Sequence, residues 1–240
     1  LGGNTWTPIG YYASSSAIYP FRGNVNGNNC TIKNFRTSGS YRGLFGYVRS
    51  DTDADNDILI QDINVEANVS GSQYVGGLCG FICGYSKKID GVQHYRCNAK
   101  IQNCTFNGTI SASSSDSYVG GIAGIAYYTE INACATAGRV SGTSYVGGIV
   151  GDAYSASSSS SYKPIVQNCA NSALVSGANV YVGGIVGYAY YAIVRYNVNG
   201  GCIFGNSNYI GGIIGYIAKS TSVSYCLNAG TVNTGLNEGG

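Results

Sequence analysis

The chain has 240 residues, of which 37 are glycine and 22 are tyrosine, only 10% are charged, and the formal net charge is +2. This composition differs from that of an ordinary enzyme domain, and 44% hydrophobic residues is too many for a disordered chain. No dense Lys/Arg cluster is present, so we expect no nucleic-acid binding, and no apolar run is long enough to span a bilayer, so we expect no membrane insertion.

Residues 1–30 contain no copy of the repeat that organises the rest of the chain. The segment from Trp6 to Gly10 lies in this region, ahead of the repeats. The first residues have neither the basic nor the apolar part of a signal peptide. We therefore expect an N-terminal capping segment over residues 1–30 and repeats over residues 31–240. We also expect the chain to be one piece of a larger polypeptide.

Two landmarks recur along the repeats. The first is a seven-residue motif of the form YVGGIVG, which begins at Tyr74, Tyr118, Tyr145, Tyr181 and Tyr209. The second is an aliphatic-x-Asn-Cys element, which is complete at Ile101 and Val166 and looser elsewhere. The leading aliphatic residues of all copies are Ile32, Ile60, Ile101, Ile131, Val166, Val194 and Val223. The spacing of these aliphatic residues indicates a unit of about 28 residues, with insertions near residues 81–100, 112–117 and 154–164.

Hydrophobic and polar positions alternate between the landmarks, as at Val65, Ala67 and Val69. This two-residue period is typical of a β-strand and differs from the 3.6-residue period of a helix. One unit cannot bury its apolar side alone, whereas stacked units pair each strand with the coils above and below. The sequence therefore predicts an all-β protein, a parallel β-helix (solenoid) of about seven coils with three strands per coil.

Equivalent residues of successive coils should form ladders along this solenoid. The Gly-Gly pair is expected where a turn crowds the neighbouring coil, because glycine has no side chain and permits unusual backbone angles. A corner ladder is expected because asparagine tolerates left-handed backbone, and its members are Asn34, Asn103 and Asn168, with Asp62 in the same position. An internal ladder of unbonded thiols is also expected, formed by Cys104, Cys134, Cys169 and Cys226.

The YVGGIVG motif followed by aliphatic-x-Asn-Cys resembles the GLUG-motif repeats of large bacterial surface proteins. The resemblance covers nearly the whole chain. It implies a secreted or cell-surface location, commonly in adhesin-like proteins and in some immunoglobulin A-cleaving metallopeptidases outside their catalytic part. It implies no catalytic residues, and it leaves the three insertions as the places where an individual member would carry its own binding properties.

The familiar signatures of catalysis are missing from the sequence. The one histidine, His94, cannot supply a His-Glu-x-x-His zinc site, and no nucleophile elbow accompanies it for a Ser-His-Asp arrangement. A carbohydrate-cleaving β-helix would need grouped carboxylates, and the chain has 11 Asp and Glu in total. We therefore expect the chain not to be an enzyme, with a polysaccharide-active β-helix enzyme as the alternative.

An acidic segment resembles half of a calcium loop, because carboxylates at alternate positions are ligands that Ca²⁺ prefers. The candidate ligands are Asp51, Asp53, Asp55, Asp57 and Asp62. Asn56 stands where such loops have glycine, and a solvated acidic turn is the competing interpretation. No cofactor is expected to be required, and calcium is the candidate ion.

The tyrosines are the pattern that most suggests recognition. If they face outward, they form an aromatic strip that could bind a glycan or a host or matrix protein; the alternative is that the rings stack along the rod and stabilise it. The candidate residues are Tyr74, Tyr118, Tyr145, Tyr181, Tyr209 and Tyr188.

The expected function is a non-catalytic extracellular repeat module, either an adhesin-like stalk or a ligand-binding scaffold on the cell surface. A second alternative to this function follows from the open ends of a β-helix. Unpaired strand edges invite end-to-end association, so the chain could also be a self-associating filament subunit.

Overall fold

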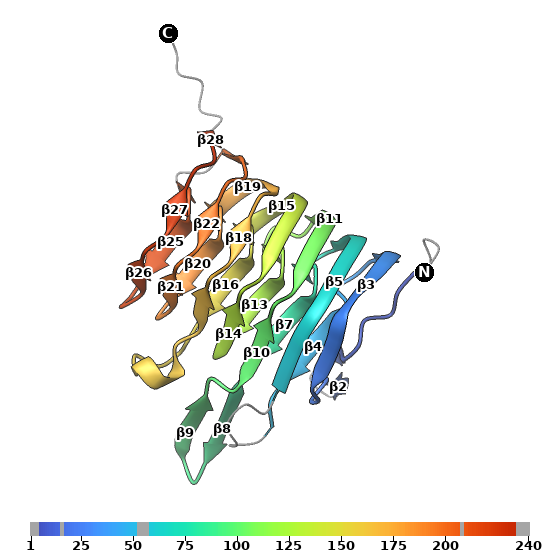
Figure 1. Ribbon diagram of the computed structural model, residues 1–240. Coiled ribbons are helices and arrows are strands. Elements are labelled where there is room, and N and C mark those ends of the chain that lie inside the picture. The colour runs from blue at the N-terminus through green and yellow to red at the C-terminus, as the bar shows by residue number, and fades with distance from the viewer. Residues whose placement is uncertain (1–4, 15–16, 52–57, 207–208, 234–240) are drawn as a thin grey trace.

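The computed structural model describes residues 5–14, 17–51, 58–206 and 209–233. Over these residues the chain winds into an all-β parallel β-helix, whose coils stack along one axis (Figure 1). The predicted fold class is thus confirmed. In this part of the chain, no helix is long and apolar enough to cross a membrane.

One wall of the β-helix is a six-stranded parallel sheet, called sheet B here. Its strands pair in chain order, and five of them begin at the sixth residue of the YVGGIVG motif, because the glycine pair turns the chain just before that residue. The strands of sheet B are β4 (Phe45–Arg49), β7 (Cys79–Cys83), β13 (Ala123–Tyr127), β16 (Val150–Tyr154), β20 (Val186–Tyr190) and β25 (Ile214–Ala218).

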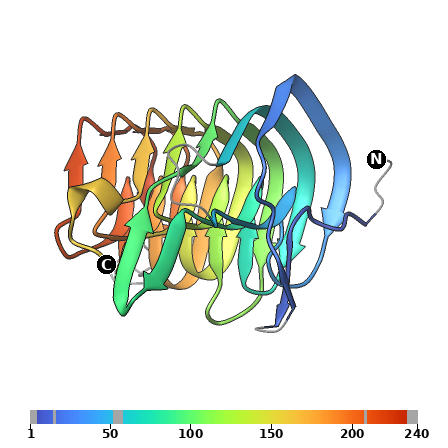
Figure 2. The ribbon, with the colours of Figure 1, turned by 90° about the horizontal axis from the view of Figure 1, so that it is seen from below.

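The remaining walls belong to one large bent sheet, called sheet A, which has seven levels (Figure 2). From the first level to the last, its strands are β3 (Val25–Thr37); β5 (Ile58–Gly71) and β6 (Tyr74–Gly76); β10 (Ala99–Gln102), β11 (Thr105–Ala112) and β12 (Tyr118–Gly120); β14 (Thr129–Asn132) and β15 (Ala135–Gly147); β17 (Ile165–Gln167), β18 (Ala170–Asn171) and β19 (Leu174–Gly183); β21 (Ile193–Arg195), β22 (Val198–Asn199), β23 (Ile203–Gly205) and β24 (Ile210–Gly211); and β26 (Ser222–Ser224), β27 (Leu227–Asn228) and β28 (Val232–Asn233).

The register of sheet A follows the predicted repeat from the second coil onward. Each leading aliphatic residue pairs with the next, from Ile60 through Ile101 and Ile131 to Val223. The first coil departs from the prediction, because Val25 and not Ile32 pairs with Ile60. Between Asn26 and Cys30 the first coil has two more residues than the second coil has between their partners, Gln61 and Ile63. Because the pairing begins at Val25, the first coil starts within the segment that the sequence assigns to the cap.

The predicted corner ladder is correct for three of its four members. Asp62, Asn103 and Asn168 have positive φ angles of 57°, 52° and 54° at the same corner. Asn103 donates a hydrogen bond from Nδ2 to Oδ1 of Asp62 at 3.2 Å. Asn34 is misplaced by the prediction: it lies further along the first coil, just after Lys33, which pairs with Glu66, because the additional residues shift the register there.

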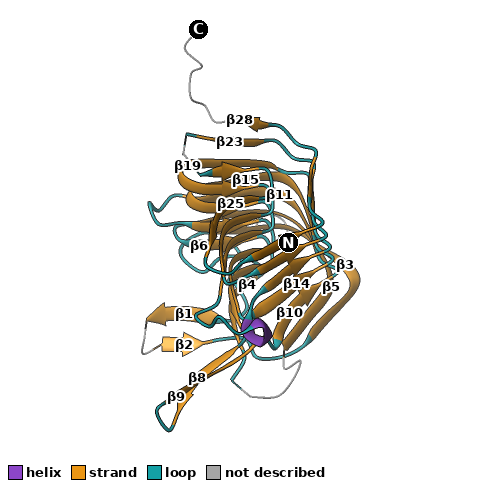
Figure 3. Ribbon diagram, turned by 90° about the vertical axis from the view of Figure 1, so that its left-hand side faces the viewer, coloured by secondary structure: helices purple, strands orange, loops and turns teal. Residues whose placement is uncertain are grey.

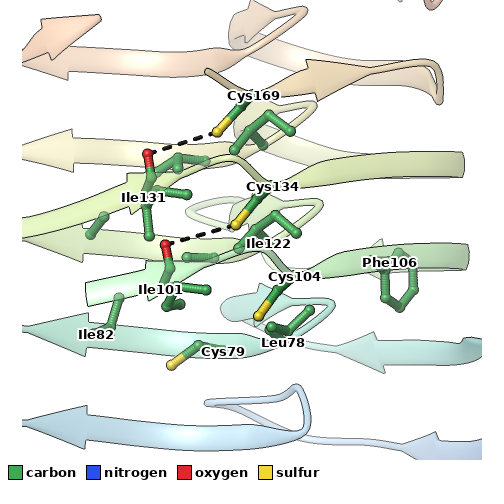
Figure 4. Close-up of a cluster of buried hydrophobic side chains, with 14 of the residues drawn as sticks. Leu78, Cys79, Ile82, Ile101, Cys104, Phe106, Ile122, Ile131, Cys134 and Cys169 are labelled. Atoms are coloured by element: carbon green, nitrogen blue, oxygen red, sulfur yellow. Dashed lines mark hydrogen bonds between the residues drawn. The ribbon is translucent and has the colours of Figure 1, made fainter. Parts of the chain in front are cut away.

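The cysteine ladder lies inside the β-helix, as predicted. Figure 4 shows Cys104, Cys134 and Cys169 one above another, and all nine cysteines of the chain, each within the described residues, are unbonded. The thiols of Cys134 and Cys169 donate to the carbonyl oxygens of Ile101 and Ile131 at 3.8 and 3.7 Å. Each thiol therefore bonds to the backbone of the preceding coil.

Smaller elements extend from the stack. The region of the first predicted insertion holds an antiparallel hairpin of β8 (Tyr85–Ile89) and β9 (Val92–Arg96), which projects from the coils (Figures 1 and 3). The third holds the 3₁₀ helix η1 (Ser160–Tyr162). At the N-terminal end, β1 (Tyr11–Ser14) pairs with β2 (Ala17–Tyr19), and Trp6 donates from Nε1 to the carbonyl of Leu44 at 3.0 Å.

Candidate functional site

Three parallel columns of side chains lie side by side at the junction of sheets A and B, and we call them the tyrosine face. The first column comes from the end of sheet A, and the other two come from the outward side of sheet B. The first column precedes the Gly-Gly turn and consists of Tyr41, Tyr74, Tyr118, Tyr145, Tyr181 and Tyr209. The second consists of Tyr47, Phe81, Ile125, Asp152, Tyr188 and Tyr216. The third consists of Arg49, Cys83, Tyr127, Tyr154, Tyr190 and Ala218.

The first column is a continuous stack of rings. Centroids of neighbouring tyrosines lie 4.5 to 5.4 Å apart from Tyr41 through Tyr118 to Tyr209. The coil spacing of a parallel β-helix sets this distance, because each tyrosine occupies the same position one strand further along. The predicted alternative, that the rings stack along the rod, therefore describes their packing.

The same rings also form an exposed surface. Tyr74, Tyr118, Tyr145 and Tyr181 are half-buried, and Tyr209 is 42% exposed. Part of each ring therefore stays accessible to solvent although its neighbours in the column pack against it, so packing and recognition do not exclude each other.

All six tyrosines predicted as binding residues lie on this face. Tyr188 contacts the first column at Tyr145 and Tyr181, with ring centroids 5.6 and 5.2 Å apart. Sequence reasoning missed Tyr127, Tyr154 and Asp152. The sequence does contain a pattern that could have identified these three residues. After the last glycine of each motif, inward and outward positions alternate, so the first and third residues after that glycine lie on the outward side.

Three tyrosine hydroxyls of the face hold their protons more tightly than a free tyrosine does. Burial raises the pKa of Tyr118, Tyr127 and Tyr188, the last to about 12, and the charge of Asp152 adds to each shift. A neutral tyrosine offers a hydroxyl that both donates and accepts hydrogen bonds, together with an electron-rich ring face.

Asp152 is the exceptional residue of the face. It is only 5% exposed, and its Oδ1 has no hydrogen-bond partner. Burial raises its pKa from 3.8 to about 8, because the charged form is poorly solvated there. Its register partners in the adjacent coils, Ile125 and Tyr188, have larger side chains at the same position.

The calcium prediction falls partly outside the described residues, because Asp53, Asp55 and Asp57 lie in the segment 52–57. Asp51 forms ion pairs with Arg22 and Arg49. Asp62 occupies the corner ladder and accepts the hydrogen bond from Asn103. Among the described residues, no group of three or more His, Cys, Asp or Glu could hold a metal ion, and calcium binding by this segment stays a prediction.

A concave site lies between two of the insertions. The hairpin and η1 enclose a pocket of about 360 Å³, whose lining includes His94, Arg96 and Tyr162. The rings of Tyr95 and Tyr162 lie 6.0 Å apart, so the two insertions contact each other. The sequence indicated these insertions as binding loops without indicating that they meet.

Comparison with known proteins supports the fold. No family model and no curated protein matches the chain. A crystal structure from Bacteroides ovatus, described as a "putative immunoglobulin A1 protease", is similar with a TM-score of 0.61 and 22% sequence identity. The match covers 90% of this chain and 63% of that one, so the chain spans less than two thirds of that protein's length.

This comparison corrects one expectation from the sequence. We expected the chain not to be an enzyme, because familiar catalytic signatures are missing and the repeats resemble a scaffold. The solved structure of similar fold is described as a "putative immunoglobulin A1 protease", which contradicts that expectation, and we withdraw it. The error was to treat the lack of familiar motifs as evidence about function.

Proposed function

We propose that this chain is a β-helix module of a secreted or cell-surface protein, and that its tyrosine face recognises a glycan or a host or matrix protein. The observation that carries the proposal is the half-exposed array of aromatic rings on one wall of a rigid solenoid. Aromatic rings provide large contact areas with little loss of conformational entropy, which is why they are enriched at recognition surfaces.

Two further considerations support this proposal. The protein of similar structure is described by its action on an immunoglobulin, and a module of this fold in such a protein would meet extracellular glycoproteins. The resemblance of the repeats to the GLUG motif agrees with a surface location and an adhesin-like role.

The rigidity of the face also favours recognition. Its tyrosines are held by parallel strands on both sides along most of its length, so little order has to be created on binding. A ligand that contacts several rings at once would gain from this preorganisation. An extended glycan or polypeptide lying along the columns fits that geometry best.

An array of glycans, matrix proteins and immunoglobulins tests the proposal, with the purified chain applied in calcium and in chelator. The variant carries Tyr181→Ala, Tyr188→Ala and Tyr209→Ala. The matched control carries Tyr196→Ala and Tyr225→Ala, a stacked and exposed pair with centroids 5.0 Å apart at the corner of sheet A.

We expect a ligand whose affinity falls at least about tenfold in the face variant and is unchanged in the control, since a central aromatic anchor contributes more than about 1 kcal/mol. Circular dichroism and thermal unfolding establish that both variants are folded. Equal binding by the face variant and the wild-type chain would show that the tyrosine face is not the recognition surface. Loss of binding in chelator would assign a role to the Asp51–Asp62 segment.

A further inference from the structure

Asp152 stands in the middle of the tyrosine face with its side chain outward. Its neighbours Val150 and Ala153 point into the core and are fully buried, whereas Asp152 shares its column with Tyr188 and Tyr216. The chain therefore places a short carboxylate where the next two coils have aromatic rings.

This carboxylate has no compensating partner within the described residues. Its Oδ1 is buried without a hydrogen bond, and burial shifts its pKa with no opposing contribution from a basic side chain. The basic residues around the face are directed elsewhere: Arg49 lies beside Tyr47 and Asp51, and Lys163 lies over the ring of Tyr191. A buried carboxylate in this state is costly and gains most from a cation.

The rings around Asp152 are suited to the same kind of ligand. Tyr145 and Tyr188 approach with centroids 5.6 Å apart, and Tyr154 lies beside Tyr127 and Tyr190 at 4.8 and 4.9 Å. Faces of tyrosine rings attract ammonium and guanidinium groups. Asp116, exposed beside Tyr118 and Tyr145, is a second acidic residue on this part of the face.

We infer that Asp152 and the tyrosines around it form a binding site for the basic side chain, arginine or lysine, of a protein partner. The inference rests on the proposed function, since it names the chemical class that the tyrosine face recognises. A neutral sugar could hydrogen-bond to Asp152, but only a cation favours the ionised form, because burial raises the pKa of this carboxyl to about 8 when no cation is bound. A guanidinium satisfies the carboxylate with paired hydrogen bonds, cancels its charge and stacks on the rings.

Nuclear magnetic resonance titrations of the whole chain test the inference with blocked arginine and blocked citrulline, the N-acetyl methylamides of the two residues. Citrulline has nearly the same shape as arginine but no charge. We expect arginine to shift the ring signals of Tyr145, Tyr154 and Tyr188 and to bind at least about tenfold more tightly than citrulline. This comparison uses only the wild-type protein, so it does not depend on a variant folding.

The same titration on two variants tests whether Asp152 is the carboxylate that binds arginine. Asp152→Asn should reduce arginine affinity to the level of citrulline, whereas Asp116→Asn, which keeps the buried carboxylate, should change it by less than about threefold. Equal binding of arginine and citrulline, or unchanged arginine binding by Asp152→Asn, overturns the inference. A neutral oligosaccharide that shifts the same rings when arginine does not would overturn the inference and leave the proposed function standing.

Discussion

At the scale of single residues, Asp152 shows how a repeat protein can carry an individual feature. The coils before and after it use Ile125 and Tyr188 at the same position, so the fold does not require a carboxylate there. A buried, unpartnered carboxylate lowers the stability of the folded chain once it ionises. The residue therefore has a cost that packing does not explain, which is why we assign it to binding.

That cost predicts a pH dependence of stability. The pKa of Asp152 is about 8 in the folded chain and ordinary, 3.8, when unfolded, so the folded state holds the proton more tightly. Well below pH 3.8 both states are protonated, and ionisation of the residue costs no stability. Stability then falls by about 1.4 kcal/mol for each pH unit between the unfolded and the folded pKa, and the loss is complete above pH 8. Urea unfolding between pH 4 and pH 9 should show wild type losing several kcal/mol relative to Asp152→Asn.

The exposed Asp116 supplies the matched control for this measurement. Asp116→Asn should follow the wild-type curve across the same pH range, because Asp116 lies exposed on the surface. A constant difference between wild type and Asp152→Asn at all pH values would mean that Asp152 is solvated in the folded protein.

At the scale of elements, the second glycine of each YVGG turn packs directly against a side chain of sheet A. A Cβ on Gly148 would lie 2.1 Å from the carbonyl oxygen of Gly184 and 2.4 Å from Cγ of Asn171. Gly184 meets Asn199 in the same way one coil later. Asn171 and Asn199 are joined by a buried hydrogen bond of 2.7 Å, so the turn rests on a ladder of amides.

Gly148→Ala should therefore destabilise the chain by more than about 3 kcal/mol, because neither the strand backbone nor the amide ladder can move aside cheaply. Gly200→Ala is the control, since the nearest atom to its added Cβ is 3.9 Å away, and it should change stability by less than about 1 kcal/mol. Chemical unfolding of both variants measures the difference. Similar stabilities would show that the turn tolerates a side chain.

The sequence predicted the fold well because the landmarks repeat with nearly constant spacing. Stacked parallel strands place equal positions in register, so Ile101, Ile131 and Val166 had to align once the architecture was recognised. The first coil could not be predicted in the same way, since its two additional residues at the corner leave no copy of the motif there. Left-handed backbone at Tyr196 and Tyr225 was also missed, because asparagine was expected at that corner.

The candidate site was only partly predictable. The tyrosine before each Gly-Gly turn belongs to the motif, so its column could be derived from the sequence. The partial burial of the rings and the lack of a partner for Asp152 depend on how three columns pack together, which no single repeat encodes. The contact between Tyr95 and Tyr162 joins two insertions that are far apart in the sequence, and spacing alone cannot predict such a contact.

At the scale of the whole molecule, a solenoid buries its core only where another coil covers it. Val223, Ile217 and Val232 belong to the last described coil and are 41%, 51% and 39% exposed. Their register partners one coil earlier, Val194, Ala189 and Ile203, are fully buried. Core positions are thus open at this end of the described rod, and uncovered parallel strands favour pairing with further strands.

We therefore predict that the 240-residue chain associates through this end, with sedimentation velocity showing a larger species that dissociates on dilution. Val223→Lys together with Val232→Lys should abolish association, because two ammonium groups would have to be buried between coils. Leu227→Lys is the matched control: Leu227 is 58% exposed and pairs with Val198, itself exposed on the outer side of the preceding coil, so association should persist. A wild-type chain that remains monomeric at every concentration would show that this end is already covered, and equal loss of association in the Leu227 variant would place the contact on the side of the rod instead.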